Sequence, residues 1–175
     1  MRRLAMLALP VVIAACAATT MVVDNTQLPE AVRVPAGQAQ TMSTTGRGEI
    51  TYECRAKAGA AGVFEWAFVA PVATLVDASG KTVGKYYAGP TWEANDGSKV
   101  SGKQVAIAPA APGNIPLQLV KTEPAMGQGA MQGMSYIQRL KTQGGVAPAS
   151  PCTAVDVGRR QQVGYAADYV FYRAR

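Results

Sequence analysis

The residues best suited to chemistry lie in the segment Thr91-Trp92-Glu93 and in the turn Asn95-Asp96-Gly97-Ser98 that follows it. An aromatic ring beside a carboxylate and small polar groups can stack on a sugar ring and hydrogen-bond its hydroxyls. The structural alternative is that the tryptophan fills the core and the turn residues are present for their backbone angles. On the functional interpretation, the candidate ligand-binding residues are Trp92, Glu93, Asp96 and Ser98.

Catalysis by this segment would depend on carboxylates. Glu93, with Glu65 or Asp96 as its partner, could form the acid and base pair of a hydrolase or lyase that acts on carbohydrate. Glu65 stands among Phe64, Trp66 and Phe68, so it either faces solvent from the opposite side of a strand or is partly buried. Elsewhere in the chain, Tyr136 and Arg139 could face one pocket.

The chain contains no histidine. Its absence excludes Ser-His-Asp and Cys-His catalysis and removes the commonest metal ligand. The sequence also has no P-loop and no GxGxxG motif. Asp77, Asn95 and Asp96 could offer oxygen ligands to calcium, but their spacing matches no EF-hand loop. We therefore expect neither a metal nor a cofactor.

The first sixteen residues have the pattern of a bacterial lipoprotein signal. Two arginines give a positive start, a short apolar run follows, and Ile13-Ala14-Ala15-Cys16 fits the lipobox. The apolar run is too short for a transmembrane helix, which needs ~20 residues. The sequence predicts a signal peptide over 1–15, lipidation of Cys16 and a tether over 16–27; the alternative is an ordinary signal peptide.

Lipidation would place the protein in the bacterial cell envelope. Several acyl chains on one residue anchor a protein stably, whereas one chain is marginal. An aspartate directly after the lipidated cysteine would favour retention in the inner membrane. This chain has Ala17 at that position, which favours export to the outer membrane. We expect the membrane as one partner and an envelope protein or a glycan as another. The sequence leaves the membrane face and the oligomeric state open.

Charge argues against nucleic acid as a partner. Removal of Arg2 and Arg3 with the signal peptide lowers the formal net charge from +6 to +4. The remaining basic residues are scattered, and Arg159-Arg160 is their longest run. Nucleic-acid-binding domains instead gather their basic residues on one face or along one helix.

The chain has three cysteines, which is an odd number for an exported protein. Lipidation would use Cys16 and leave Cys54 and Cys152 as a pair. Exported compartments permit disulfides, so we expect a Cys54–Cys152 disulfide, with two buried free thiols as the alternative. The sequence has no CxxC motif, which argues against redox catalysis and zinc binding.

Glycines and prolines divide the chain after Leu28 into short segments that have the pattern of strands. Val63–Val69 alternates, and Pro71 is expected to end or bend it. The last strand, Gln161–Tyr172, places on one face Tyr165, Ala167, Tyr169 and Phe171. Two hairpins are expected, one that pairs Ala73–Asp77 with Lys81–Tyr87 and one that pairs Thr91–Glu93 with Lys99–Ile107. Further strands are expected at Ile50–Ala56, Ile115–Lys121 and Ser135–Thr142.

No window outside the signal peptide shows a helical stripe of apolar residues. Many short strands with Gly/Pro turns are typical of sandwiches and barrels. We therefore expect an all-β fold, a single-domain antiparallel β-sandwich or barrel over residues 28–175. The function that we expect is non-enzymatic binding of a partner, glycan or small ligand at the membrane surface; the carbohydrate-active hydrolase or lyase is the alternative.

Long, distinctive motifs connect this chain to a known family. They are Gly62-Val63-Phe64-Glu65-Trp66-Ala67-Phe68-Val69-Ala70-Pro71, Lys85-Tyr86-Tyr87-Ala88-Gly89-Pro90-Thr91-Trp92-Glu93 and Gly144-Gly145-Val146-Ala147-Pro148. Together they resemble the DUF3455 family of exported proteins, whose function is not known. Two positions depart from the family pattern, with Tyr86 where a histidine is usual and Leu117 where a tryptophan is usual. If that histidine were catalytic in the family, this chain would be inactive or different.

Overall fold

The computed structural model describes residues 22–175. The predicted signal peptide, Cys16 and the tether as far as residue 21 lie outside the described residues, so these remain predictions. Within residues 22–175, no helix has both the length and the apolar character needed to cross a membrane.

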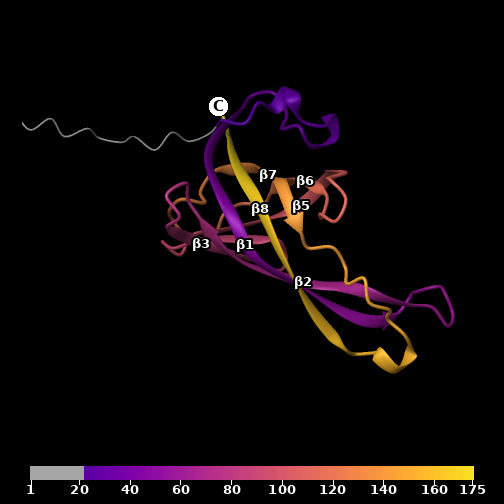
Figure 1. Cartoon of the computed structure of the whole chain (residues 1–175). Helices are drawn as coiled ribbons and strands as arrows, with labels where there is room; N and C mark the ends of the chain where they lie inside the picture. The colour runs from indigo at the N-terminus through magenta and orange to yellow at the C-terminus, as the bar shows by residue number, and fades with distance from the viewer. Residues whose placement is uncertain (1–21) are drawn as a thin grey trace, which may run out of the picture.

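Eight antiparallel strands form the domain, and each pairs with the next until β8 pairs with β1 and closes a barrel (Figure 1). The prediction of an all-β single domain is confirmed, and of its two forms the chain adopts the barrel. The strands are β1 (Gln38–Ala56), β2 (Phe64–Val76), β3 (Thr82–Tyr87), β4 (Thr91–Ala94), β5 (Lys99–Ala108), β6 (Leu117–Thr122), β7 (Met134–Gly144) and β8 (Arg160–Ala174). Three short 3₁₀ turns complete the described structure: η1 (Asn25–Gln27), η2 (Glu30–Val32) and η3 (Ala154–Asp156).

Both predicted hairpins are present, as β2–β3 and β4–β5, but β2 does not end at Pro71. The strand continues through the proline to Val76. Pairing with β3 begins only at Val72, so at Pro71 the strand bonds to β1 alone. Proline lacks the N–H that a second ladder would need, and it is tolerated where a strand has a neighbour on one side only.

The barrel interior is an aromatic core. Tyr165, Ala167, Tyr169 and Phe171 of β8 are all buried in it, which confirms the face predicted for the last strand. Trp92 is fully buried against Tyr169 and Phe171, with ring centroids 5.6 and 6.3 Å apart. Gly46 of β1 faces this cluster. A Cβ there would lie 2.6 Å from the Tyr169 ring, so a side chain would displace the tyrosine.

A second, smaller core lies outside the barrel. Residues 22–35 run across the outer face of β6, β7 and β8, where Val32 and Val34 pack against Leu119, Leu140 and Val170. The amide of Gln138 is buried at this interface and donates to the carbonyl oxygen of Val32 at 2.6 Å. The segment therefore belongs to the domain, and residues 22–175 contain all eight strands and both cores as one folding unit.

The two ends of the barrel differ. At the closed end, the loop over residues 125–133 folds across the opening and buries Met131, which is 2% exposed. At the open end, β1, β2 and β8 continue past the other strands as a twisted arm, seen at the lower right of Figure 1. The register shows the same asymmetry, because β1 pairs with β2 as far as Ala56 whereas β3 reaches β2 only at Val72.

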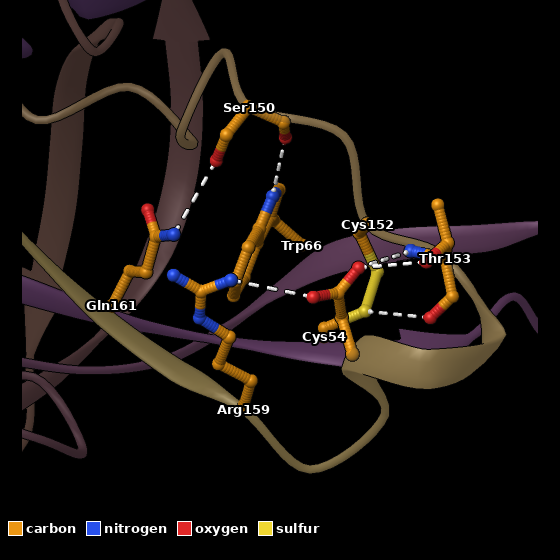
Figure 2. Close-up of polar contacts among 8 residues, drawn as sticks. Cys54, Trp66, Ser150, Cys152, Thr153, Arg159 and Gln161 are labelled. Carbon is orange, nitrogen blue, oxygen red and sulfur yellow. Dashed lines mark hydrogen bonds and ion pairs between the residues drawn. A yellow bond between two sulfur atoms is a disulfide. The ribbon is translucent and has the colours of Figure 1, made fainter.

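A disulfide fixes the loop that runs beside the arm. Cys54 in β1 and Cys152 in the loop before β8 are joined, with their Cα atoms 5.6 Å apart, which confirms the predicted pair. Nearby, the indole nitrogen of Trp66 donates to the carbonyl oxygen of Ser150 at 2.8 Å (Figure 2). Gln161 of β8 donates to the Ser150 hydroxyl, so the loop is held from both strands.

Candidate functional site

Trp92, the aromatic residue of the first candidate site, belongs to the core. Its side chain is fully buried, and its ring centroid lies 4.9 Å from that of Tyr86. The indole nitrogen has no hydrogen-bond partner within residues 22–175. The ring presents no exposed face on which a sugar could stack.

Glu93 follows Trp92 in β4, so its side chain points to the other side of the sheet. Its carboxylate accepts a hydrogen bond from the Tyr87 hydroxyl at 2.7 Å and pairs with Lys85 at 3.2 Å and with Lys99 at 3.9 Å. The bond from Tyr87, followed by the contact with Lys85, lowers the pKa of Glu93. The residue therefore stays ionised on the outer surface, where it can accept a proton but is poorly suited to act as a general acid.

Asp96 and Ser98 hold the closed end together. One oxygen of Asp96 accepts from the Ser98 backbone N–H at 2.9 Å, and the other accepts from the Ala130 N–H at 2.7 Å. The Ser98 hydroxyl in turn accepts from the Met131 N–H at 3.1 Å. The Ser98 hydroxyl also donates to Asp96 at 2.5 Å. This bond, followed by the bonds from the backbone N–H groups of Ala130 and Ser98, lowers the pKa of Asp96. Both residues thus connect the β4–β5 turn to the loop that closes the barrel.

Glu65 lies apart from these residues, in the arm. It forms a 3.5 Å ion pair with Lys57, and both side chains are about half exposed. The structure thus places Trp92 in the core, Glu93 on the outer face of β4 and Glu65 in the arm. It brings Asp96 and Ser98 together, but as a turn and not around a hollow. No described feature gathers these carboxylates around one substrate site.

A concave site does exist at the open end of the barrel, which we call the mouth cavity. Its volume is about 670 Å³. Its apolar wall comes from both the barrel and the base of the arm: Ile50, Tyr52, Phe68, Pro71, Tyr86 and Ile115. Cavities of several hundred Å³ with mostly apolar walls and a few polar groups are typical of small-molecule sites.

Arg139 of β7 is the main polar group of the mouth cavity. It has the same orientation in the strand as Ile137, whose side chain is in the barrel core. Its Nε and Nη2 atoms both donate to the carbonyl oxygen of Pro116, at 3.2 and 2.9 Å. Within the described residues it forms no ion pair.

Two glutamines line the cavity beside the arginine. Gln118 of β6 lies directly across from Arg139 in the strand register. Its Nε2 donates to Oε1 of Gln104 at 2.7 Å, while its own Oε1 is buried without a partner in the described part of the chain. The cavity wall therefore holds polar groups whose hydrogen-bonding capacity is not used within the domain.

The tyrosines around the cavity are neutral. Burial raises the pKa of Tyr86 to about 12 and also raises the pKa of Tyr52 and Tyr165, while Arg139 acts in the opposite direction on all three. The Tyr52 hydroxyl donates to the carbonyl oxygen of Gly145 at 2.7 Å. These phenols therefore keep their protons near neutral pH and do not supply a counter-charge to the guanidinium.

The sequence indicated Arg139 only as a residue that shares a pocket with Tyr136, and the structure separates the two. Tyr136 packs against the outer core with the N-terminal segment, whereas Arg139 lines the mouth cavity. Residues 136 and 139 have opposite parity in a strand, so they point to opposite sides. That spacing could have identified Arg139 as the residue that shares the inward face with Ile137.

A second hollow of about 580 Å³ lies outside the barrel, beside the N-terminal segment. We call it the outer groove. Val22, Leu28 and Val170 are among the residues that line it, and Lys141 and Asp168, which pair at 3.3 Å, also line it. Asp24 and Asp77 also line this groove, so its charged groups are mostly acidic, whereas those of the mouth cavity are basic.

These features define a class: a single-domain antiparallel barrel, closed at one end and hollow at the other. Residues 35–173 match the family described as "Protein of unknown function (DUF3455)", and the chain belongs to that family. A search of the curated proteins and a search of the solved structures each found no match. The function must therefore be argued from the site itself.

Proposed function

We propose that this protein is a lipid-anchored envelope protein that binds a small organic ligand in the open end of its barrel and does not catalyse a reaction on it. The observation that carries the proposal is the mouth cavity. One end of the barrel is filled by Trp92, Met131 and the loop over them, while the other end leaves about 670 Å³ unfilled between apolar walls. Eight-stranded barrels are just wide enough to hold one small ligand.

The apolar wall supplies the driving force for binding. Phe68 is 57% exposed at the rim, although its ring is one of the large apolar groups of the chain. It meets Tyr52 edge-on, with the ring centroids 6.2 Å apart, so the two rings form a fixed aromatic edge. A ligand that covers such surface gains roughly 25 cal/mol for each Å² of apolar area removed from water.

The position of the N-terminus fits an anchored binding protein. The backbone N–H of Val23 donates to the side chain of Gln40, near the start of β1 and at the closed end of the barrel. A lipid on Cys16 would be joined to the domain at that end. The mouth cavity would then open away from the membrane, where a ligand can reach it.

The proposal can be tested with the folding unit 22–175 and the neutral fluorescent probe N-phenyl-1-naphthylamine. We expect saturable binding with one site per domain. Ala88→Trp, at an exposed position on the cavity rim, should weaken binding at least tenfold because the indole would fill the opening.

The matched control is Ala78→Trp, at an exposed position that lines the outer groove. It should leave binding unchanged. If Ala78→Trp loses binding and Ala88→Trp does not, the ligand binds in the outer groove. If the unmodified domain shows no saturable binding, the proposal is wrong. Membrane anchoring is tested separately, because Cys16→Ala in the full chain should release the protein from membranes.

A further inference from the structure

We infer that the ligand of the mouth cavity is an amphipathic organic anion, and that Arg139 is the residue that binds its charged group. This inference rests on the proposed function and adds the class of ligand. It begins with the location of the arginine, which lies on the inward face of β7 among Ile50, Tyr86 and Ile115, not on the outer surface of the barrel.

The guanidinium is only partly used. A guanidinium carries five N–H donors. In Arg139, one donor on Nε and one on Nη2 contact the protein, and both donate to the carbonyl oxygen of Pro116. This contact holds the side chain in place. The remaining N–H groups have no acceptor within residues 22–175, so they are available to a ligand oxygen.

Nothing in the cavity wall neutralises the charge. The charged residues that line the cavity are Lys103 and Arg139, and no aspartate or glutamate lines it. Lys103 is 85% exposed and pairs with Glu123 outside, at 3.2 Å. By contrast, Arg159 and Arg160 at the arm each pair with a carboxylate. Arg139 thus has a charge without a counter-charge in the described residues, and it lines a cavity in which a ligand can supply one.

The surroundings strengthen an interaction with an anion. Arg139 lies beside apolar groups and neutral tyrosines, where a charge pair is stronger than in water. An arginine also matches the two oxygens of a carboxylate, or those of a phosphate or sulfonate, in a bidentate arrangement. Gln104 lines the cavity next to it, and its side-chain amide N–H groups make no hydrogen bond in the described structure, which adds further donors.

The apolar wall completes the description of the ligand. An anion without an apolar body would leave the exposed ring of Phe68 uncovered, and a neutral ligand would leave Arg139 without a counter-charge. A cationic ligand would be repelled. The ligand that satisfies both parts of the site has an acidic head group on an aliphatic or aromatic body.

The test compares three probes with one chain length: dodecanoate, 1-dodecanol and dodecyltrimethylammonium, each used below its micelle concentration to displace N-phenyl-1-naphthylamine from the folding unit 22–175. We expect dodecanoate to bind at least tenfold more tightly than dodecanol, and the ammonium compound to bind most weakly. Arg139→Met should remove the preference for dodecanoate and leave the affinity for dodecanol unchanged. Arg139→Lys should retain part of the preference, and Arg159→Met, outside the cavity, should retain all of it.

If dodecanoate and dodecanol bind the unmodified domain with equal affinity, the inference is wrong and the proposed function still stands. The same conclusion follows if the probe binds but neither compound displaces it. If the probe itself does not bind, the proposed function fails first. The three-ligand comparison needs no substitution, so it decides the inference even if Arg139→Met does not fold.

Discussion

The two ends of the barrel use the same eight strands for different purposes. At the closed end, the polar groups that join the β4–β5 turn to the loop over it are paired: Asp96 accepts from Ser98 and Ala130, and the Ser98 hydroxyl accepts from Met131. At the open end, the guanidinium of Arg139 and the Oε1 atom of Gln118 keep unused capacity. Buried polar groups are normally paired. The unpaired indole nitrogen of Trp92 is enclosed by the core, whereas the unused groups at the open end line a hollow that an outside molecule can enter.

The difference also explains why the first candidate segment and the mouth cavity do not coincide. The residues around Thr91-Trp92-Glu93 have chemically suggestive types, but their partners are all internal. Trp92 meets other rings, and Glu93 meets Tyr87, Lys85 and Lys99. Residue type alone suggests chemistry, whereas the partners of a residue show whether that chemistry is free to act.

The largest effect should come from breaking the covalent link at the arm. Cys54→Ser should lower the free energy of unfolding by roughly 2–4 kcal/mol, because the disulfide closes a long loop of the unfolded chain. The two cysteines are 98 residues apart. Urea unfolding measures the change, and reduction of the unmodified protein should cause a similar loss. Equal stability with and without reductant would contradict this account.

Hydrogen exchange can then locate the effect. We expect faster exchange first in the part of the arm that the disulfide holds, around Trp66 and Ser150, while the core strand around Tyr169 stays protected. Simultaneous loss of protection at both ends would show that the barrel and its arm unfold as one unit.

Much of the fold could be predicted from local patterns. Alternation in β8 placed Tyr169 and Phe171 on the core face, and the turn residues located both hairpins. The first half of β1 could not be found this way. Residues 38–49 are mostly small or polar, and they form a strand because β8 and β2 flank them. Gly46, which a strand pattern would disfavour, is needed there to make room for the Tyr169 ring.

The mouth cavity was harder to predict because it depends on closure of the barrel. Its wall combines β1, β2, β3, β5, β6 and β7, and no local pattern shows that these strands meet around one space. A single arginine in a strand is typical of an outward-facing position. Only its parity with Ile137 indicates that Arg139 faces inward, and parity identifies a face without showing that the space beside it is empty.

A smaller effect is expected at the closed end. Asp96→Asn keeps an oxygen for Ser98 but replaces the oxygen that accepts from Ala130 with an amide that donates. We expect the melting temperature to fall by a few degrees and the loop over Met131 to exchange faster. Binding in the mouth cavity should not change, since the substitution is at the opposite end.

Asp77→Asn is the matched control for Asp96. Asp77 accepts the same local bonds from Ser79, two residues later. Its other hydrogen bond comes from the Lys81 N–H in the same turn, and in the described structure its carboxylate accepts none from another loop. Its substitution should therefore lower the melting temperature less. An equal loss in both variants would show that Asp96 acts within its own turn and does not hold the barrel closed.

The smallest effect should be a pH dependence at the arm. Hydrogen bonds from Arg55, and next from Arg160, lower the pKa of Glu53 to about 2 from its ordinary value of 4.5. A carboxylate with a lowered pKa in the folded state contributes stability above its unfolded pKa and loses it as the pH falls toward its folded pKa. Stability should therefore fall between about pH 4.5 and about pH 2. Glu53→Gln should reduce that slope, as measured by urea unfolding across this range.

Removal of Arg55 tests whether Glu53, and not another carboxylate, causes this pH dependence. In Arg55→Gln, the pKa of Glu53 should rise toward its ordinary value in an NMR titration of the carboxyl group, because the largest contribution to the shift is gone. High salt should weaken the remaining effect, since the pair is near the surface and is screened by ions. An unchanged titration in Arg55→Gln would mean that Arg160 alone, at 2.7 Å, holds the carboxylate and that the Arg55 contact does not persist in solution.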